Sequence, residues 1–251
     1  YYQTIDPRIK VVFRKENGHI CRASNSAISI ATGEYCSLLD HDDIITVDAL
    51  YEVVKALNLN TKLDFIYSDE DKINDNGDLS TPHFKPSWSP YSLLCRNYIC
   101  HFSTMRKTIL EEIGGFREGF EGSQDHDLFL RFTERTKKIH HIPKILYHWR
   151  IHHQSTSMNP DSKSYTHTAG KKAVQDSLTR QNIDAIVTDV DADTKNTFIL
   201  KPKKGTINDK VSIIIPTKDN YEVLKTCIDS IIKQKTYLNF LILIINNQST
   251  E

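Results

Sequence analysis

Apolar and polar residues along this chain follow two alternating patterns. Short runs of apolar and β-branched residues at 8–13, 33–39 and 64–68 predict strands. Between these runs, residues 24–31 and 47–59 place apolar side chains at helical spacing, which predicts amphipathic helices. The order strand, helix, strand, helix, strand is typical of a parallel sheet that is covered by helices. The pattern therefore predicts an α/β fold.

The remainder of the chain continues with the same two patterns. The further elements predicted are a hairpin turn at 74–78, strands at 98–105 and 144–151, helices at 107–113, 128–136 and 165–181, a weak hairpin at 188–204, and a strand, a helix and a strand at 211–216, 221–233 and 240–245. The last three elements form one βαβ unit. Residues 158–161 look like a boundary. We therefore divide the chain into residues 1–157, a helix-plus-hairpin linker at 158–210, and the βαβ unit at 211–251.

A cluster of acids follows the predicted strand at 33–39. Ionised carboxylates are costly to bury unless they are paired or bind a metal, and the carboxyl end of a strand is where ligands bind in open α/β sheets. Asp40 and Asp42 are two residues apart, so they share a face on an ideal strand. Carboxylate oxygens suit Mg²⁺ or Mn²⁺, which usually also hold the phosphates of a substrate. The alternative is an acidic loop that caps the next helix through Asp43 or Thr46.

Composition narrows the possible functions. The chain has 251 residues, with 32 Lys and Arg against 32 Asp and Glu, and this balance argues against a nucleic-acid-binding protein, which needs a basic surface. No apolar run approaches the length of a membrane span, and the polar first residues do not resemble a signal peptide. Five cysteines without a CxxC pair are typical of reduced thiols in a cytosolic protein. Because the chain does not begin with Met, we expect it to be a fragment.

Several motifs, taken together, resemble those of the family-2 glycosyltransferases, which are nucleotide-sugar enzymes of the GT-A fold. The motifs occupy residues 14–20, 23–25, 33–43, 67–72, 115–116, 122–127 and 147–150. The similarity is greatest to bacterial proteins with tandem GT-A domains of the O-antigen or rhamnosyl-transferase type. The resemblance implies a Rossmann-like GT-A fold, in which a mixed sheet is flanked by helices.

The resemblance also implies how the chain is organised. Residues 1–157 look like the C-terminal part of a GT-A domain, whereas residues 211–251 look like the N-terminal βαβ unit of such a domain. Two arrangements stay open. Either the βαβ unit begins a second domain, or it folds back and completes the first sheet in permuted order, since exposed edge strands favour such pairing.

By the same resemblance, Asp40, His41 and Asp42 form the metal motif of the family, with Mn²⁺ or Mg²⁺ as the cofactor. The ion would bridge the two phosphates of the donor and neutralise charge on the leaving nucleoside diphosphate. Asp42 is the expected direct ligand, with Asp40 nearer the ribose or the waters of the metal. We expect His148 near the metal or diphosphate and Arg150 on phosphate oxygens. The alternative for these two residues is a polar pair on a half-exposed strand.

Asp125 matches the acid that the family uses as its general base. It would take the proton from the acceptor hydroxyl while that oxygen attacks the anomeric carbon of the donor sugar. One base on the face opposite the leaving group implies a single displacement with inversion, in contrast to the two-step retaining mechanism. The alternative is that Asp125 only caps its helix. Gln124 stands where the family usually has Glu.

The remaining predicted contacts are divided between donor and acceptor. For the donor they are Asn25, Asp40, Arg150, Thr217, Asp219 and Asn247, and for the acceptor they are Asp69, Asp71, Trp88, Gln124 and Asp127. For Asp69 and Asp71 the alternative is a solvated acidic loop, and for Trp88 it is a buried aromatic side chain. Asn246 stands where many members of the family have Asp, so selectivity for uracil or thymine is in question.

The sequence thus predicts a metal-dependent, inverting glycosyltransferase. It would move a sugar from a UDP-, dTDP- or GDP-linked donor to a glycan or lipid-linked acceptor in the synthesis of bacterial surface polysaccharide. Its expected location is the cytoplasm, with at most peripheral association with the inner face of the plasma membrane. Two other classes stay open: a non-catalytic module that binds carbohydrate or a partner, and a metal-dependent phosphohydrolase.

Overall fold

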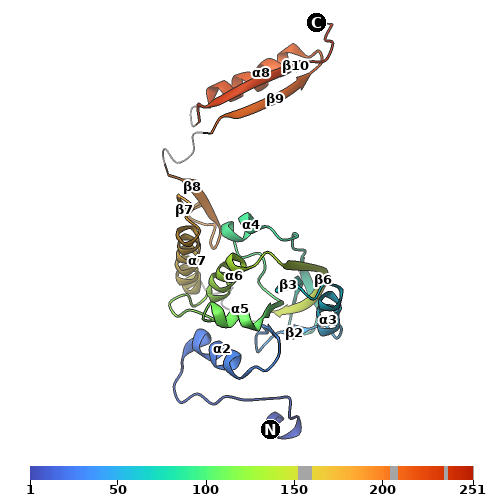
Figure 1. Ribbon diagram of the computed structural model, residues 1–251, viewed down its shortest axis with the longest axis vertical. Coiled ribbons are helices and arrows are strands. Elements are labelled where there is room, and N and C mark those ends of the chain that lie inside the picture. Colours follow the sequence, from blue (N-terminus) through green and yellow to red (C-terminus); the bar gives the residue numbers. More distant parts are fainter. Residues whose placement is uncertain (152–159, 204–208, 235–236, 251) are drawn as a thin grey trace. The chain divides into compact units, whose positions relative to one another are not determined.

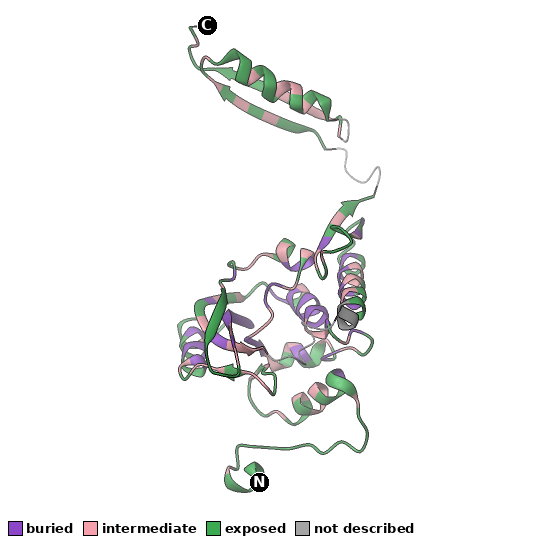
Figure 2. Ribbon diagram, turned by 180° about the vertical axis from the view of Figure 1, so that it is seen from behind, coloured by how far each residue is buried: buried purple, intermediate pink, exposed green. Residues whose placement is uncertain are grey.

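The structure is a computed structural model that describes residues 1–151, 160–203, 209–234 and 237–250 (Figure 1). The chain forms two compact units, Tyr1–Lys201 and Pro202–Glu251. Each unit is described below by itself. Figure 2 shows that buried positions gather on the central strands and helices of the first unit.

A six-stranded sheet forms the centre of the first unit. Its strands are β1 (Tyr35–Ser37), β2 (Ile44–Ile45), β3 (Phe65–Ile73), β4 (Leu79–His83), β5 (Ser103–Arg106) and β6 (Ile139–Arg150). The order is β1-β5-β3-β6-β2, and β4 also pairs with β3. Strands β3 and β6 are parallel, whereas the other pairs are antiparallel. The predicted mixed sheet is thus confirmed.

Strand β3 is the central strand and differs most from its prediction. The sequence pattern ended this strand at Ser68, where three acids begin, but β3 continues through all three to Ile73. Eight of its nine residues are buried. The acids remain within the strand because basic side chains pair with each of them, as described below, and paired carboxylates can be buried. An apolar pattern alone does not contain this information.

Helices α3 (Ala49–Leu59), α5 (Lys107–Glu112) and α6 (Gln124–Arg135) pack against the sheet. The other helices described in this unit are α1 (Tyr2–Ile5), α2 (His19–Ile30), α4 (Pro90–Cys95) and α7 (Pro160–Arg180), and a two-stranded sheet of β7 (Ala185–Asp189) and β8 (Phe198–Pro202) follows α7. The helices predicted at 47–59, 107–113, 128–136 and 165–181 are confirmed within a few residues. Helix α2 begins earlier than predicted.

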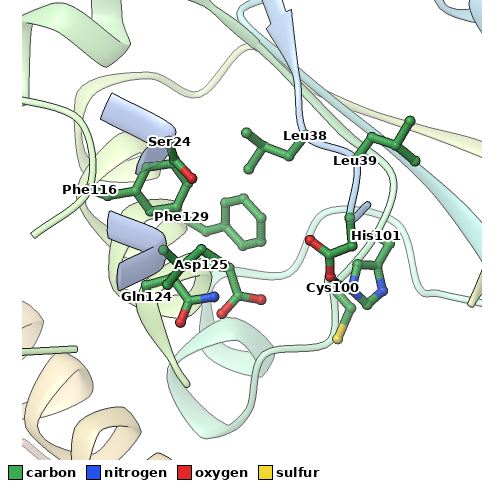
Figure 3. Close-up of a pocket in the computed structure, with 11 residues that line it drawn as sticks. Ser24, Leu38, Leu39, Cys100, His101, Phe116, Gln124, Asp125 and Phe129 are labelled. Carbon is green, nitrogen blue, oxygen red and sulfur yellow. Dashed lines mark ion pairs between the residues drawn. The ribbon is translucent and has the colours of Figure 1, made fainter. Parts of the chain in front are cut away.

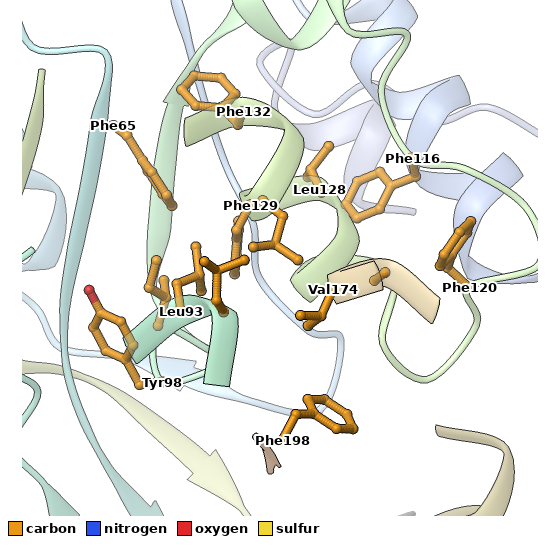
Figure 4. Packing of buried hydrophobic residues seen from close by; sticks show 14 of the residues in the cluster. Phe65, Leu93, Tyr98, Phe116, Phe120, Leu128, Phe129, Phe132, Val174 and Phe198 are labelled. Atoms are coloured by element: carbon orange, nitrogen blue, oxygen red, sulfur yellow. The ribbon is translucent and has the colours of Figure 1, made fainter. Parts of the chain in front are cut away.

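Aromatic side chains join α6 to β3. The ring centroid of Phe65 on β3 lies 5.3 Å from that of Phe129 and 5.5 Å from that of Phe132, both on α6 (Figure 4). All three side chains are completely buried. Helix α7 packs against α6, and its Ala173 and Val174 are buried. This core fixes the N-terminus of α6 relative to the sheet.

The prediction of a strand at residues 8–13 is wrong. These residues form no strand in the structure, and Val11, Val12 and Phe13 are exposed. A β-branched run becomes a strand only where a neighbouring strand pairs with its backbone N–H and C=O groups. The predicted strand at 98–105 is similarly reduced to β5, which begins at Ser103.

The second unit consists of β9 (Val211–Thr217), α8 (Tyr221–Lys233) and β10 (Phe240–Asn246), which confirms the predicted βαβ pattern. Strands β9 and β10 are parallel along their whole length and form a two-stranded sheet of their own. The two arrangements left open for this unit, the start of a second domain or the completion of the first sheet in permuted order, stay predictions. Strand β9 pairs with β10 at a low cost in loop-closure entropy, because only α8 and two short loops separate them in the sequence.

The core of the first unit gives the first prediction. Phe132→Ala should lower the free energy of unfolding by about 3–5 kcal/mol, because it removes a fully buried ring from the contact with Phe65. Urea denaturation followed by circular dichroism measures this change. The matched control is Tyr51→Ala on α3, where the side chain is 65% exposed and the expected change is below about 0.5 kcal/mol. Equal losses in both variants would contradict the packing described here.

Candidate active site

A cavity of about 130 Å³ lies where the end of β1, the segment before β5 and the N-terminus of α6 meet. Figure 3 shows Gln124 and Asp125 of α6 on one side, facing Cys100 and His101 on the other. Asp40 also lines this cavity. Its apolar wall is formed by Ile20, Leu38, Leu39, Phe116 and Phe129. Two carboxylates that are 85 positions apart in the sequence therefore share one cavity.

Asp125 is the second residue of α6, and both of its carboxylate oxygens accept hydrogen bonds. Oδ1 accepts from the backbone N–H of His126 at 2.8 Å, and Oδ2 accepts from Nδ2 of Asn97 at 2.7 Å. The neighbouring Gln124 accepts through Oε1 from the backbone N–H of Gly122 at 2.6 Å. The carboxylate is thus oriented from two directions where it borders the cavity.

The acidic loop after β1 is tied to β6. Asp43 accepts hydrogen bonds from the hydroxyl of Tyr147 and, at 2.8 Å, from the backbone N–H of Arg150. Arg150 also donates through Nε to the backbone oxygen of Asp42 at 2.7 Å. Helix α3 begins only after Asp48, so the alternative in which Asp43 or Thr46 caps that helix is wrong.

Three side chains here offer ligand atoms for a metal ion. One atom from each of Asp40, Asp43 and His101 lies within 4.8 Å of the others. Carboxylate oxygens and an imidazole nitrogen suit Mn²⁺. Burial raises the pKa of the Asp43 carboxyl above its ordinary value, so a nearby cation would favour its ionised form. Asp42 does not line the cavity, and its carboxylate lies 3.6 Å from Nδ1 of His41.

His101 connects the acidic loop to the centre of the sheet. Its Nε2 lies 3.6 Å from a carboxylate oxygen of Asp40, and its Nδ1 lies 3.2 Å from Glu70. Burial opposes its positive charge, but the hydrogen bonds with Asp40 and Glu70 outweigh burial and raise the pKa of His101 to about 10. Its ring also stacks on Tyr147, with centroids 4.7 Å apart. The imidazole is therefore protonated at neutral pH.

Glu70 on β3 is buried under this histidine. Its carboxylate accepts hydrogen bonds from Nζ of the fully buried Lys85 at 3.0 Å and from the backbone N–H of His101 at 3.0 Å. Burial alone would raise the pKa of Glu70. Hydrogen bonds from His101 and His83, together with the charge of Lys85, hold the pKa of Glu70 well below its ordinary value. A charged network therefore supports the loop that carries His101.

The other two acids of β3 are also buried and paired. Asp69 accepts from Nε2 of His141 at 2.7 Å and from the backbone N–H of Lys85 at 2.8 Å. Asp71 pairs with Nδ1 of His148 at 2.5 Å. The alternative of a solvated acidic loop is wrong, because both carboxylates lie inside the sheet. The structure thus places His148 against Asp71, and their predicted contacts with the metal, donor or acceptor stay predictions.

Two further predicted residues hold the loop before α6. The amide of Asn25 donates to the backbone oxygen of Phe116 at 2.8 Å and accepts from its N–H at 2.8 Å. The fully buried Asp127 pairs with Arg117 and Arg131. Both side chains are thus used in contacts within the protein. Trp88 is half-buried and packs against the apolar core.

Three predicted donor residues belong to the second unit. Asn247 donates its backbone N–H to the backbone oxygen of Thr217 at 2.7 Å, and Asp219 accepts from the N–H of Thr250 at 2.7 Å. They lie together at the carboxyl ends of β9 and β10, which is the edge where ligands bind in parallel α/β units.

Sequence reasoning missed Asn97, Cys100 and His101. They lie in a segment whose apolar residues suggested a continuous strand from residue 98. Polar residues interrupt this apolar run, and that interruption could have indicated a loop. It does not indicate which residues these polar side chains contact. Their roles follow only from contacts with residues 28 and 31 positions away in the sequence.

Comparison with known proteins identifies the class. The chain belongs to glycosyl transferase family 2, whose sequence model matches residues 1–114 and 212–251. The α/β fold with its mixed sheet is the GT-A fold that the motifs predicted. No helix in the part of the chain that the structure describes has the length and apolar character needed to cross a membrane.

The relatives are longer proteins. Protein y4gI of Sinorhizobium fredii (strain NBRC 101917 / NGR234) is 42% identical over 252 residues, which cover 100% of this chain and 28% of that protein. O-antigen biosynthesis protein RfbC of Myxococcus xanthus is 36% identical over 245 residues, which cover 98% of this chain and 19% of that protein. The chain thus spans less than a third of the length of either relative.

A solved structure shares the fold. It is the mannosyltransferase PcManGT from Pyrobaculum calidifontis in complex with GDP-Man and Mn²⁺. The TM-score is 0.50 at 17% sequence identity, and the match covers 69% of this chain and 49% of that one. At this identity the similarity supports the fold alone.

The raised pKa of His101 gives the second prediction. A group whose pKa is higher in the folded state contributes its full stability below its unfolded pKa of 6.5, and loses this contribution as pH rises through about 10. The free energy of unfolding should therefore fall over this interval more steeply in the unsubstituted protein than in His101→Gln. The excess slope is at most about 1.4 kcal/mol for each pH unit. Urea denaturation at several pH values measures it.

The control for this prediction is His41→Gln. The side chain of His41 is 97% exposed, so its replacement should leave the pH dependence of the free energy of unfolding unchanged. Parallel curves for the unsubstituted protein and His101→Gln would contradict the charge assigned to His101.

Proposed function

We propose that the first unit catalyses the inverting transfer of a sugar from a nucleotide-diphosphate donor to a hydroxyl group of an acceptor. The observation that carries this proposal is that Asp125 and Asp40 line the same cavity. Asp125 is available for the acceptor. The acidic loop after β1, together with His101, is available for the donor phosphates. The segments that hold them come from different parts of the sequence and are fixed by buried contacts.

Asp125 serves as the general base. It accepts the proton of the acceptor hydroxyl while that oxygen forms a bond to the anomeric carbon. At the same time, the bond from this carbon to the diphosphate oxygen breaks, and the electron pair leaves with the diphosphate. A single displacement of this kind inverts the configuration at the anomeric carbon, in contrast to a retaining mechanism with two displacements.

Asp40, Asp43 and His101 fit a divalent cation, Mn²⁺ or Mg²⁺, with Asp42 in the same loop. When bound, such an ion neutralises charge on the leaving diphosphate. A protonated imidazole is not a metal ligand, so His101 binds the ion only after it loses its proton. While His101 keeps its proton, Asp40 and Asp43 would provide the ligands and His101 would provide a fixed positive charge.

The chemistry of the relatives supports the substrate class. The mannosyltransferase of the same fold is in complex with GDP-Man and Mn²⁺, which supports a nucleotide-sugar donor for this chain. The similarity to an O-antigen biosynthesis protein supports a glycan or lipid-linked acceptor in surface polysaccharide synthesis. All five cysteines are free thiols, which supports the predicted cytoplasmic location.

A second candidate function is a non-catalytic module that binds carbohydrate. The observation that favours it is the size of the cavity, because about 130 Å³ is well below the about 300–1,000 Å³ that is typical of sites enclosing a whole ligand. It matches one sugar ring better than an entire nucleotide sugar. Loss of transfer on substitution of Asp125 separates the two candidates, since a binding module has no transfer to lose.

The third prediction concerns the base. Asp125→Asn should lower kcat for sugar transfer by about 10²–10⁴-fold, because the amide cannot accept the proton of the acceptor. Asp78→Asn, which changes an exposed acid in the turn before β4, is the matched control and should retain full activity. Both variants are assayed in the full-length protein with UDP-, dTDP- and GDP-linked donors. An unchanged kcat in Asp125→Asn would contradict the role of Asp125.

The fourth prediction concerns the cation. Asp40→Asn should weaken binding of Mn²⁺, titrated alone and followed by electron paramagnetic resonance, by about tenfold or more, because it removes a charged ligand. Asp42→Asn in the same titration shows whether this neighbour also binds the ion. Binding should become tighter as pH rises, since protons compete for the ligands. Equal affinity in the unsubstituted protein and Asp40→Asn would contradict the assignment.

A further inference from the structure

The side chain of Asn97 links the segment between α4 and β5 to the carboxylate of Asp125. Its Nδ2 lies 2.7 Å from Oδ2 of Asp125, and both side chains are partly buried. Asn97 has no part in the chemistry described above. Its contact with the mechanism is therefore the hydrogen bond to Asp125, the proposed base.

The orientation of the Asn97 amide follows from its second contact. Its Oδ1 accepts the backbone N–H of Cys100 at 3.3 Å. A backbone N–H can only donate, so the oxygen of the amide must face Cys100 and the NH₂ group must face Asp125. The reverse orientation would place the amide oxygen against a carboxylate oxygen and the NH₂ group against an N–H donor. The contact is consequently a hydrogen bond from a neutral donor to a carboxylate.

The segment that carries Asn97 is held in place by buried contacts. Nζ of the fully buried Lys85 donates to the backbone oxygen of Ile99 at 2.5 Å. The hydroxyl of Tyr98 accepts the backbone N–H of Ser89 at 3.0 Å. The neighbouring helices are joined as well, because Nε2 of the buried His126 lies 2.6 Å from the backbone oxygen of Leu93. The donor and the acceptor of the Asn97–Asp125 bond are thus both fixed.

We propose that Asn97 is a positioning residue for the general base. It occupies one acceptor site on Oδ2 of Asp125 while the backbone N–H of His126 occupies one on Oδ1. Rotation of the carboxylate would break both bonds, so its remaining acceptor sites keep one direction with respect to the cavity. This inference rests on the proposed role of Asp125 and adds the residue that sets its orientation.

Other titratable groups also face Asp125. They are Cys100 and His101 across the cavity, Asp40 at the end of β1, and His126 on α6. None of them is changed in the Asn97 variants. A difference in pH dependence between these variants and the unsubstituted protein therefore reports the Asn97 contact.

Two variants test the proposal in the full-length protein. Asn97→Ala removes the donor and should lower kcat by about 10–100-fold with little change in KM for the donor sugar, because a misplaced base slows the chemical step. Asn97→Asp places a second carboxylate next to Asp125. The negative charge of this carboxylate should make Asp125 ionise less readily. The acidic limb of the pH profile of kcat should therefore move to higher pH in Asn97→Asp. The control is Asn76→Asp, which adds the same charge in an exposed turn and should change neither quantity.

A measurement that does not depend on activity separates this inference from the proposed function. Carbon-13 NMR of the Asp125 carboxyl should show its titration at higher pH in Asn97→Asp, and urea denaturation confirms that each variant folds. An unchanged titration together with an unchanged kcat in both Asn97 variants would overturn the positioning role, even where Asp125→Asn abolishes transfer. An unchanged kcat in Asp125→Asn would instead overturn the base itself.

Discussion

The candidate site depends on one buried charge, the carboxylate of Glu70 in the central strand. It accepts hydrogen bonds from Lys85 and from His101, and so connects β3 to two loops that approach it from different parts of the sequence. Removing the Glu70 carboxylate would leave the fully buried Lys85 without the acid that pairs with it, and breaking a buried ion pair in this way costs about 3–5 kcal/mol. A well-packed apolar pair can be as stable as a buried ion pair, so the energetic gain does not explain the network. Its geometry does, because it fixes the backbone that carries His101 beside Asp40.

Buried contacts also fix the backbone on the other side of the cavity. Helix α6 is fixed to β3 by aromatic rings, and the loop before it is held by Asn25, Arg131 and Asp127. Each half of the site is thus supported by side chains that are themselves buried and paired. The residues that border the cavity consequently need no rearrangement to face one another, which is the condition for a preorganised site.

The sequence predicted the elements better than their partners. The α/β class, the helices at α3, α5 and α8, and the acids after β1 were all evident from apolar periodicity and from motifs. The length of β3 was not, because a strand that contains three acids is stable only where basic side chains reach it from other elements. The strand at 8–13 failed for the complementary reason. Its apolar pattern was suitable, but strand formation also needs a neighbouring edge, and a pattern gives no information about neighbours. His101 and Asn97 were missed because their partners, Glu70 and Asp125, are distant in sequence.

The two units differ in how far their structure constrains function. In the first unit, Asp125, Asp43 and His101 each contact a buried or half-buried side chain, so their positions are determined by the fold. In the second unit no described residue is buried, and apolar side chains of β9 and β10 such as Ile214 and Ile245 are exposed. A sheet of two strands is marginally stable in water, and one helix covers only one of its faces. The predicted donor residues Thr217, Asp219 and Asn247 lie at the carboxyl ends of these strands, so how firmly they are positioned depends on what covers the other face. The positions of Asp125 and of the acidic loop do not depend on such a covering, because the buried core of the first unit already fixes both.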